Sequence, residues 1–207
     1  MDAVIFSSYF PCNSYISKFL IYDKVVIDIF ENYIKQTYRN RCKIITANGV
    51  NSLTVPVKKN KNLIIKEIEI DYSEQWQKNH YRSILSAYKN SAFYDFYMPE
   101  IISIFSKRYK YLIDLNSNIL EIVFKILKYK SDFTYSDTYV ENKNIKDYRD
   151  FLHPKAHKNK FENEYKQEKY IQVFSDRHGF VADLSILDLI FNLGPLSLSV
   201  IKQSIRH

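Results

Sequence analysis

The spacing of apolar residues changes once along this chain, near Ser73, and that change limits what it can fold into. Before Ser73, short runs of alternating or β-branched apolar residues are typical of strands. After it, apolar side chains recur every three or four residues, as in helices that bury one face. A chain of 207 residues suffices for one sizeable core. The pattern predicts a single α/β domain over residues 1–207, with a sheet first and a helical C-terminal half packed on it.

The first 30 residues predict a β-α-β unit. Residues 3–7 form an apolar run that ends before Pro11, and proline pushes the preceding residue toward an extended conformation. Residues 14–22 fit a short helix, and residues 24–29 are rich in β-branched side chains. We therefore expect two strands joined by a helix.

A hairpin and a further strand are predicted next. Asn48 and Gly49 separate two extended runs, residues 42–47 and 52–57, and this dipeptide is a strong hairpin signal. Residues 63–70 alternate between isoleucine and glutamate at their end, which indicates another strand. Together with the β-α-β unit, these strands are expected to form a mixed sheet over residues 1–72.

The remainder divides into three regions. Residues 73–130 predict helices, residues 131–169 predict a long polar loop with short ordered pieces, and residues 170–207 predict a strand followed by helices. The last strand is expected at residues 170–174. A helix is expected over residues 185–192, because Ser185 and Asp188 have capping-box spacing, and this explains the pair without a catalytic role.

The segment ENYIKQTYRNR, residues 31–41, is the strongest candidate for a binding site. Arg39 and Arg41, with Asn40 between them and Lys35 nearby, place forked donors in a short connection beside the predicted sheet. Guanidinium groups bind carboxylates and phosphates with two parallel hydrogen bonds, which suits an anionic ligand. The residues alone leave a second interpretation open, in which the two arginines pair internally with Glu31 and Asp28.

Three further side chains outside this segment could take part in chemistry. His80, four residues after Trp76 on a predicted helix, could act as a general base near pH 7 or could be a hydrogen-bonded core residue. Arg149 and His153 lie in the long polar region, where a ligand could order them, although a solvated basic loop is the better-supported explanation from the residues alone.

Metal and nucleotide motifs are sparse in this sequence. Cys12 and Cys42 have no metal-binding or disulfide-framework spacing, so no metal site is predicted, although Asp23, Asp28 and Glu31 could supply oxygen ligands if they converged. Three glycines cannot build a glycine-rich phosphate loop. A phosphate would instead have to be held by arginine, lysine or a helix N-terminus.

Net charge and hydropathy indicate which partners this chain could bind and whether it could span a membrane. The net charge of +7 and pI near 9.1 suit an acidic partner or a lysine-rich solvated surface. The lysine-rich stretches 58–66 and 155–169 are separated in sequence, which disfavours nucleic acid and leaves an RNA-binding module as a minor alternative. Asp2 near the N-terminus and the lack of an apolar run of about 20 residues predict a cytoplasmic chain without a membrane span.

Several separated blocks carry a family resemblance. They are SSYFP at residue 7, ENYIKQTYRNRCKI at 31, LTVPV at 53, WQKNHYRSILSAYKNSAFYDFY at 76, DYRDFLHPK at 147, and YIQVF with LSILDLIFN after residue 170. In this order they resemble the WbqC-like protein family, in the branch common in the Bacteroidetes. The wider family opens with HQPxYFPW, of which only Tyr9, Phe10 and Pro11 remain here, so no role of the lost histidine carries over.

The resemblance implies a role in surface-polysaccharide (O-antigen type) or cell-envelope biosynthesis. Our leading hypothesis is a transferase that binds an anionic small molecule such as a nucleotide sugar, with Arg39 and Arg41 on the anion, Asn40 orienting the ligand and His80 as base. The alternative is a non-catalytic binding or scaffold protein associated with envelope biosynthesis. No cofactor and no oligomeric state are indicated. A closed region with paired arginines would favour the alternative.

Overall fold

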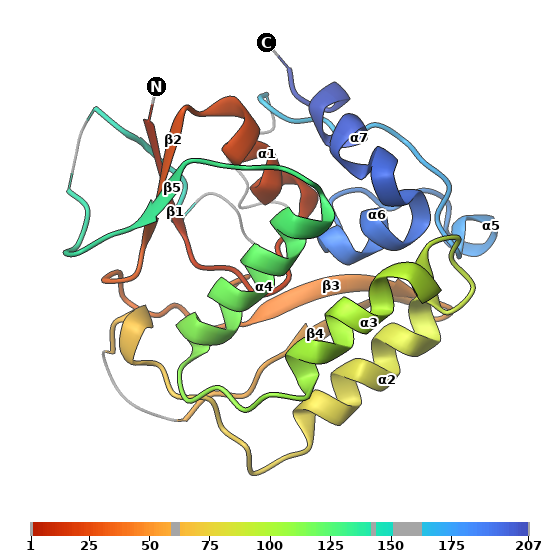
Figure 1. Cartoon of the computed structure of the whole chain (residues 1–207), viewed down its shortest axis with the longest axis horizontal. Helices are drawn as coiled ribbons and strands as arrows, with labels where there is room; N and C mark the ends of the chain where they lie inside the picture. The colour runs from red at the N-terminus through yellow and green to blue at the C-terminus, as the bar shows by residue number, and fades with distance from the viewer. Residues whose placement is uncertain (1, 59–62, 142–143, 151–162, 207) are drawn as a thin grey trace.

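The computed structural model describes residues 2–58, 63–141, 144–150 and 163–206 (Figure 1). Its main sheet contains β1 (Asp2–Phe6), β2 (Lys24–Asp28), β5 (Phe133–Tyr135) and β6 (Lys146–Asp147). Their spatial order is β5-β2-β1-β6, and every neighbouring pair is parallel. Taken in chain order this is 3-2-1-4, the strand order at the centre of doubly wound nucleotide-binding folds.

The predicted β-α-β unit is confirmed. β1 and β2 pair along their whole length, and α1 (Asn13–Ile21) connects them. Four of the five β1 residues are buried, as expected for a parallel strand that is covered on both faces. The fold class is likewise confirmed, since the chain is a mixed α/β structure with a helical C-terminal half.

The hairpin lies where Asn48 and Gly49 predict it, between β3 (Arg41–Thr46) and β4 (Gly49–Thr54). Gly49 adopts a φ of 100°, which glycine tolerates without a Cβ clash. The hairpin forms its own two-stranded sheet and does not join β1 and β2. Two short strands from the long polar region, β5 and β6, complete the main sheet instead.

The strand prediction for residues 63–70 is wrong. The segment contains a 3-10 turn, η1 (Ile65–Glu67), flanked by isolated bridges. The Ile65 and Lys66 amides donate to the carbonyls of Glu31 and Ile29, so this segment covers the connection after β2 and forms no ladder. A 3-10 turn brings residues three apart onto one side, which buries Ile65 and Ile68 together.

The helices after Ser73 are confirmed. They are α2 (Trp76–Tyr88), α3 (Tyr94–Phe105) and α4 (Leu112–Ile126), and α3 packs against both α2 and α4. Figure 1 shows α2 and α3 side by side below the hairpin, with α4 between them and the main sheet. No helix in the described part of the chain is both long and apolar enough to cross a bilayer.

The C-terminal region contains α5 (Ser175–His178), α6 (Ile186–Leu193), η3 (Gly194–Leu196) and α7 (Ser197–Gln203). The Ser185 half of the predicted capping box is confirmed, because its side chain accepts a hydrogen bond from the Leu187 amide. The Asp188 half is wrong: its carboxylate accepts from Tyr170 and Gln172, and the Ser185 amide donates to the Lys43 carbonyl. The strand predicted at residues 170–174 is wrong. There the Gln172 side-chain amide bonds both backbone groups of Val181, and so replaces the ladder that a neighbouring strand would supply.

Candidate ligand site at the carboxyl end of the parallel sheet

The strand order has its switch point between β1 and β6. Chain order runs from β1 to β2 and β5 on one side, and then crosses to β6 on the other side. In open parallel sheets, ligands bind beyond the carboxyl ends of the strands at such a switch point. Asp28 and Asp147 end two of these strands, and Arg149 lies two residues after the end of β6. The polar groups beyond these strand ends therefore form the candidate site.

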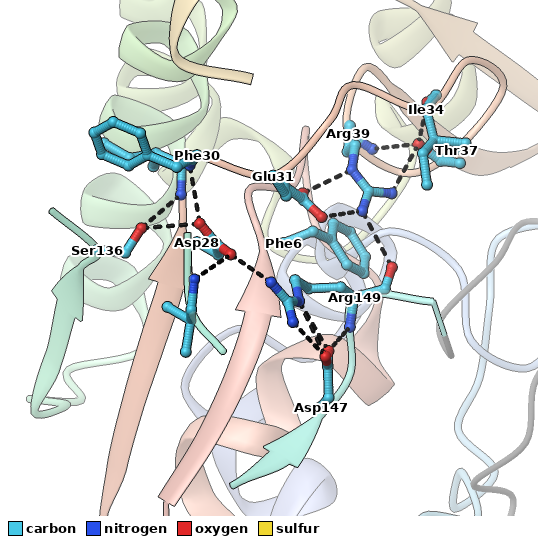
Figure 2. A network of polar contacts seen from close by, with 12 residues as sticks. Phe6, Asp28, Phe30, Glu31, Ile34, Thr37, Arg39, Ser136, Asp147 and Arg149 are labelled. Atoms are coloured by element: carbon cyan, nitrogen blue, oxygen red, sulfur yellow. Dashed lines mark hydrogen bonds and ion pairs between the residues drawn. The ribbon is translucent and has the colours of Figure 1, made fainter. Parts of the chain in front are cut away.

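Arg39 is held in an internal ion pair at this place (Figure 2). Its Nε donates to Glu31 at 2.7 Å, and its Nη2 donates to the second oxygen of the same carboxylate. Nη2 also reaches the Arg149 carbonyl, and the guanidinium lies 4.8 Å from the centre of the Phe6 ring. The Arg39 side chain is only 1% exposed. Its donors are thus taken up by the protein.

Arg149 bridges two carboxylates with very different exposure. Its Nη1 donates to Asp28 at 2.5 Å, and its Nε donates to Asp147 at 3.1 Å. Asp28 is fully buried and also accepts hydrogen bonds from Ser136 and from the Phe30 amide, whereas the Asp147 side chain is 43% exposed. Asp147 is therefore the one carboxylate of this network that reaches solvent to a large extent.

Among the residues that the structure describes, the network does not carry a surplus of positive charge. Two guanidinium groups, Arg39 and Arg149, face three carboxylates, Asp28, Glu31 and Asp147. Burial raises the pKa of Glu31 to about 7, and hydrogen bonds from Arg39 oppose that rise. Internal pairing, which the sequence left open as an alternative to anion binding, is what the structure places around Arg39.

The other candidates in residues 31–41 lie outside this network. The Asn40 amide donates to the Val55 carbonyl at 2.8 Å, and the Arg41 Nε donates to the Thr54 hydroxyl at 3.0 Å, so both support the hairpin. Lys35 is exposed. The predicted site residue His153 lies outside the described residues.

His80 is buried beside the residues that follow β1. The Tyr9 hydroxyl and His80 Nδ1 are 2.8 Å apart, and burial lowers the pKa of His80 to about 4. Burial also raises the pKa of Tyr9 well above its ordinary value, so the hydroxyl keeps its proton and the hydrogen bond joins two neutral groups. A neutral His80 with this bond joins α2 to the end of β1. Its role as a general base stays an untested prediction.

Some members of the network were not singled out in the sequence. Ser136 and Tyr139 come from the polar region, and Arg149 lies 4.4 Å above the Tyr139 ring. Nothing local marks them, because Ser136 meets Asp28 and Tyr139 meets Arg149 only through the fold. Within the residues that the structure describes, no three His, Cys, Asp or Glu side chains are grouped so as to hold a metal ion. Asp28 and Glu31 both face guanidinium groups instead.

Three pockets on the described surface lie away from the network. One of about 420 Å³ is at the start of α2, one of about 810 Å³ lies beside residues 170–177, and one of about 710 Å³ lies against the start of α4. None of these three pockets is lined by Arg39, Asn40, Arg41, His80 or Arg149.

Comparison with known proteins gives a family. One relative is the uncharacterized protein Rv1507c of Mycobacterium tuberculosis, 33% identical over 92 residues, which are 44% of this chain and 39% of that protein. The chain thus matches well under half of that relative's length. No solved structure matches this chain. The model of the WbqC-like protein family matches residues 7–164, which contain the whole Arg39–Arg149 network. The chain therefore belongs to the WbqC-like protein family.

Proposed function

We propose that this chain is a transferase of surface-polysaccharide or cell-envelope biosynthesis. It binds an anionic small molecule, such as a nucleotide sugar, beyond the carboxyl ends of β1 and β6. The observation that carries the binding site is Arg149, held by a buried carboxylate on one side and a solvent-exposed one on the other. The transferase reaction rests on the cation cluster, the titratable His80 and the long polar loop in one small fold. The role in envelope biosynthesis rests on the family resemblance, and the YRNRC form of residues 38–42 supports the Bacteroidetes-type branch.

Asp147 occupies the place that a ligand anion would take. Its carboxylate accepts from Arg149 Nε and Nη2, the paired geometry with which a guanidinium also holds a phosphate. Asp28 is buried and bonded on several sides, so it would keep the guanidinium in position while Asp147 swings away. Exchange of Asp147 for a ligand oxyanion then leaves the number of negative charges around Arg149 unchanged or higher by one.

Calorimetric titration with nucleotide sugars tests the site. Asp147→Asn removes the competing charge, and we expect it to tighten binding about tenfold, equivalent to about 1.4 kcal/mol. Arg149→Lys loses the forked geometry and is expected to weaken binding by at least that factor. Asp95→Asn, an exposed aspartate on α3, is the matched control. Equal affinities for Asp147→Asn and the wild type would overturn the proposed site.

A non-catalytic binding or scaffold protein is the second candidate. The side-chain exposure of Arg39, only 1%, and the buried Tyr9–His80 pair favour it, because a closed region around these residues serves the fold. Turnover assays with nucleotide-sugar donors separate the two candidates. Binding without turnover, unaffected by His80→Gln, supports the scaffold role.

A further inference from the structure

The pocket of about 420 Å³ at the N-terminal end of α2 collects hydrogen-bond donors from separate parts of the chain. It is lined by residues from the segment before α2, from the first turn of α2, and from the end of α3 with the residues after it. Its volume lies within the range of small-molecule sites. The side chains that matter here are Tyr72, Trp76, Lys78 and Arg108.

Within the described part of the chain, the first turn of α2 has no side-chain cap from its N-cap residue. Gln75, at the N-cap position, makes no side-chain hydrogen bond to it, and the turn contains no acidic residue. The first backbone N–H groups of a helix have no partner within the helix, and the helix dipole adds partial positive charge at this end. α2 is 13 residues long, so this end carries a developed dipole. An anion would satisfy these groups.

Trp76 adds a second, independent donor that lacks a partner. The residue lines the pocket yet is only 3% exposed, and its indole Nε1 has no hydrogen-bond acceptor among the described residues. Its ring is held between Tyr72 and His80, with centroid distances of 5.9 and 5.2 Å. A buried donor without an acceptor costs about 1–3 kcal/mol. A ligand oxygen that accepts from Nε1 would remove that cost.

Arg108 supplies a positioned cation at the same place. Its guanidinium lies 4.7 Å from the centre of the Tyr72 ring, and it forms no ion pair with a carboxylate in the described part of the chain. Tyr72 is itself fixed, because its hydroxyl donates to the Tyr109 carbonyl and accepts from the Tyr109 amide. Stacking on the ring leaves the edge of the guanidinium free to donate. Two cations, Arg108 and Lys78, thus face a single carboxylate of the lining, Glu74.

We propose that this pocket binds a phosphate group, carried by free inorganic phosphate or by a phosphorylated small molecule. The first-turn amides of α2, the Trp76 indole and Arg108 supply the donors, and Lys78 adds charge. The site is separate from Arg149, and it does not depend on the proposed transferase function.

Trp76 reports directly on occupancy, because it is the single tryptophan of the chain. Purified full-length protein is titrated with inorganic phosphate, a hexose phosphate and a nucleoside diphosphate, with chloride at matched ionic strength as the reference, while fluorescence and calorimetry are followed together. We expect a saturable change in Trp76 emission with at least one phosphate ligand and none with chloride. Absence of saturable binding in both measurements overturns the proposal.

Variants locate the site. Arg108→Ala is expected to weaken phosphate binding at least about tenfold, whereas Arg82→Ala, an exposed arginine of α2 outside the pocket lining, should leave it unchanged. Trp76→Phe keeps an aromatic ring and removes Nε1, and by calorimetry it too should weaken binding. Equal effects of Arg108→Ala and Arg82→Ala overturn the assignment.

The ligand series identifies the natural ligand. Equal affinity for phosphate and its esters identifies free phosphate as the ligand, and tighter binding of one ester identifies a phosphorylated metabolite. Arg149→Lys should leave this binding intact.

Discussion

Two regions of the molecule use similar side chains but differ in charge balance. In the network of Arg39 and Arg149, carboxylates outnumber the guanidinium groups, whereas in the pocket at the start of α2 that contains Arg108, cations outnumber carboxylates. In each, guanidinium groups lie against aromatic rings, with Arg39 over Phe6 and Arg108 over Tyr72 at 4.8 and 4.7 Å. Carboxylates converge on the network from the ends of β2 and β6 and from the segment after β2, whereas the pocket is lined by one glutamate and an uncapped helix end. An arginine in a polar segment thus becomes a structural or a binding group according to which carboxylates the fold brings to it.

Arg39→Ala should have the largest effect on stability. Removing one partner of a buried ion pair leaves the Glu31 carboxylate desolvated without a counter-charge, and such changes cost about 3–5 kcal/mol. Urea denaturation at pH 7 measures it. The double variant Glu31→Leu/Arg39→Met removes both charges and should recover most of the loss. A loss of less than about 1 kcal/mol in the free energy of unfolding for Arg39→Ala would show that the Arg39–Glu31 ion pair is not buried away from solvent.

The pH dependence of stability should reveal His80 as a buried neutral group. Its folded pKa of about 4 lies below its ordinary value of 6.5, so the unfolded chain binds a proton first as the pH falls. As the pH falls from about 6.5 to 4, the free energy of unfolding therefore decreases by about 3 kcal/mol. His80→Gln should show a correspondingly smaller decline.

The raised pKa of Glu31 affects stability in the opposite direction. As the pH falls from about 7 to 4.5, the folded chain binds this proton first, and the free energy of unfolding increases. This contribution is common to the wild type and His80→Gln, so the difference between their denaturation curves isolates the histidine. Parallel curves for the two proteins would contradict burial of His80 in its neutral form.

Asn40→Ala should cost about 1–3 kcal/mol, because it leaves the buried Val55 carbonyl without its side-chain donor. Thermal denaturation followed by circular dichroism measures the change. A loss of this size would show that Asn40 stabilises the fold and does not serve as a ligand contact. A variant of unaltered stability with lost nucleotide-sugar binding would restore Asn40 to the binding site.

Arg108→Ala should have the smallest effect on stability, within about 0.5 kcal/mol, because an exposed arginine without a buried partner contributes little to folding. Urea denaturation without phosphate measures it. In the presence of saturating phosphate, the wild type should gain stability and Arg108→Ala should not. A loss as large as that of Arg39→Ala would erase the distinction between the two regions.

Local elements followed from local patterns. The β-α-β unit, the Asn48–Gly49 hairpin, the helices after Ser73 and the Ser185 cap each depend on residues within one turn or one strand of each other. The wrong strand predictions fell on segments whose apolar patterns are compatible with more than one backbone conformation. Residues 63–70 bury their isoleucines through a 3-10 turn, and residues 170–174 are held by the Gln172 side chain.

The strands β5 and β6 could not be assigned from their own residues. They contain three and two residues, and their positions depend on pairing with β2 and β1. The same holds for the network, because Arg39 and Arg149 are 110 residues apart and meet only once the sheet has formed. No local pattern marks Arg108 either, since its environment comes from the ends of two helices.

The sequence by itself determined the family, the α/β class and the segments that carry forked donors, because these depend on residue identity and on short-range periodicity. Only the tertiary structure decided which arginines are neutralised. That outcome depends on the burial and convergence of carboxylates far apart in the chain, and in a low-dielectric interior their positions decide whether a cation is bound within the protein or left for a ligand.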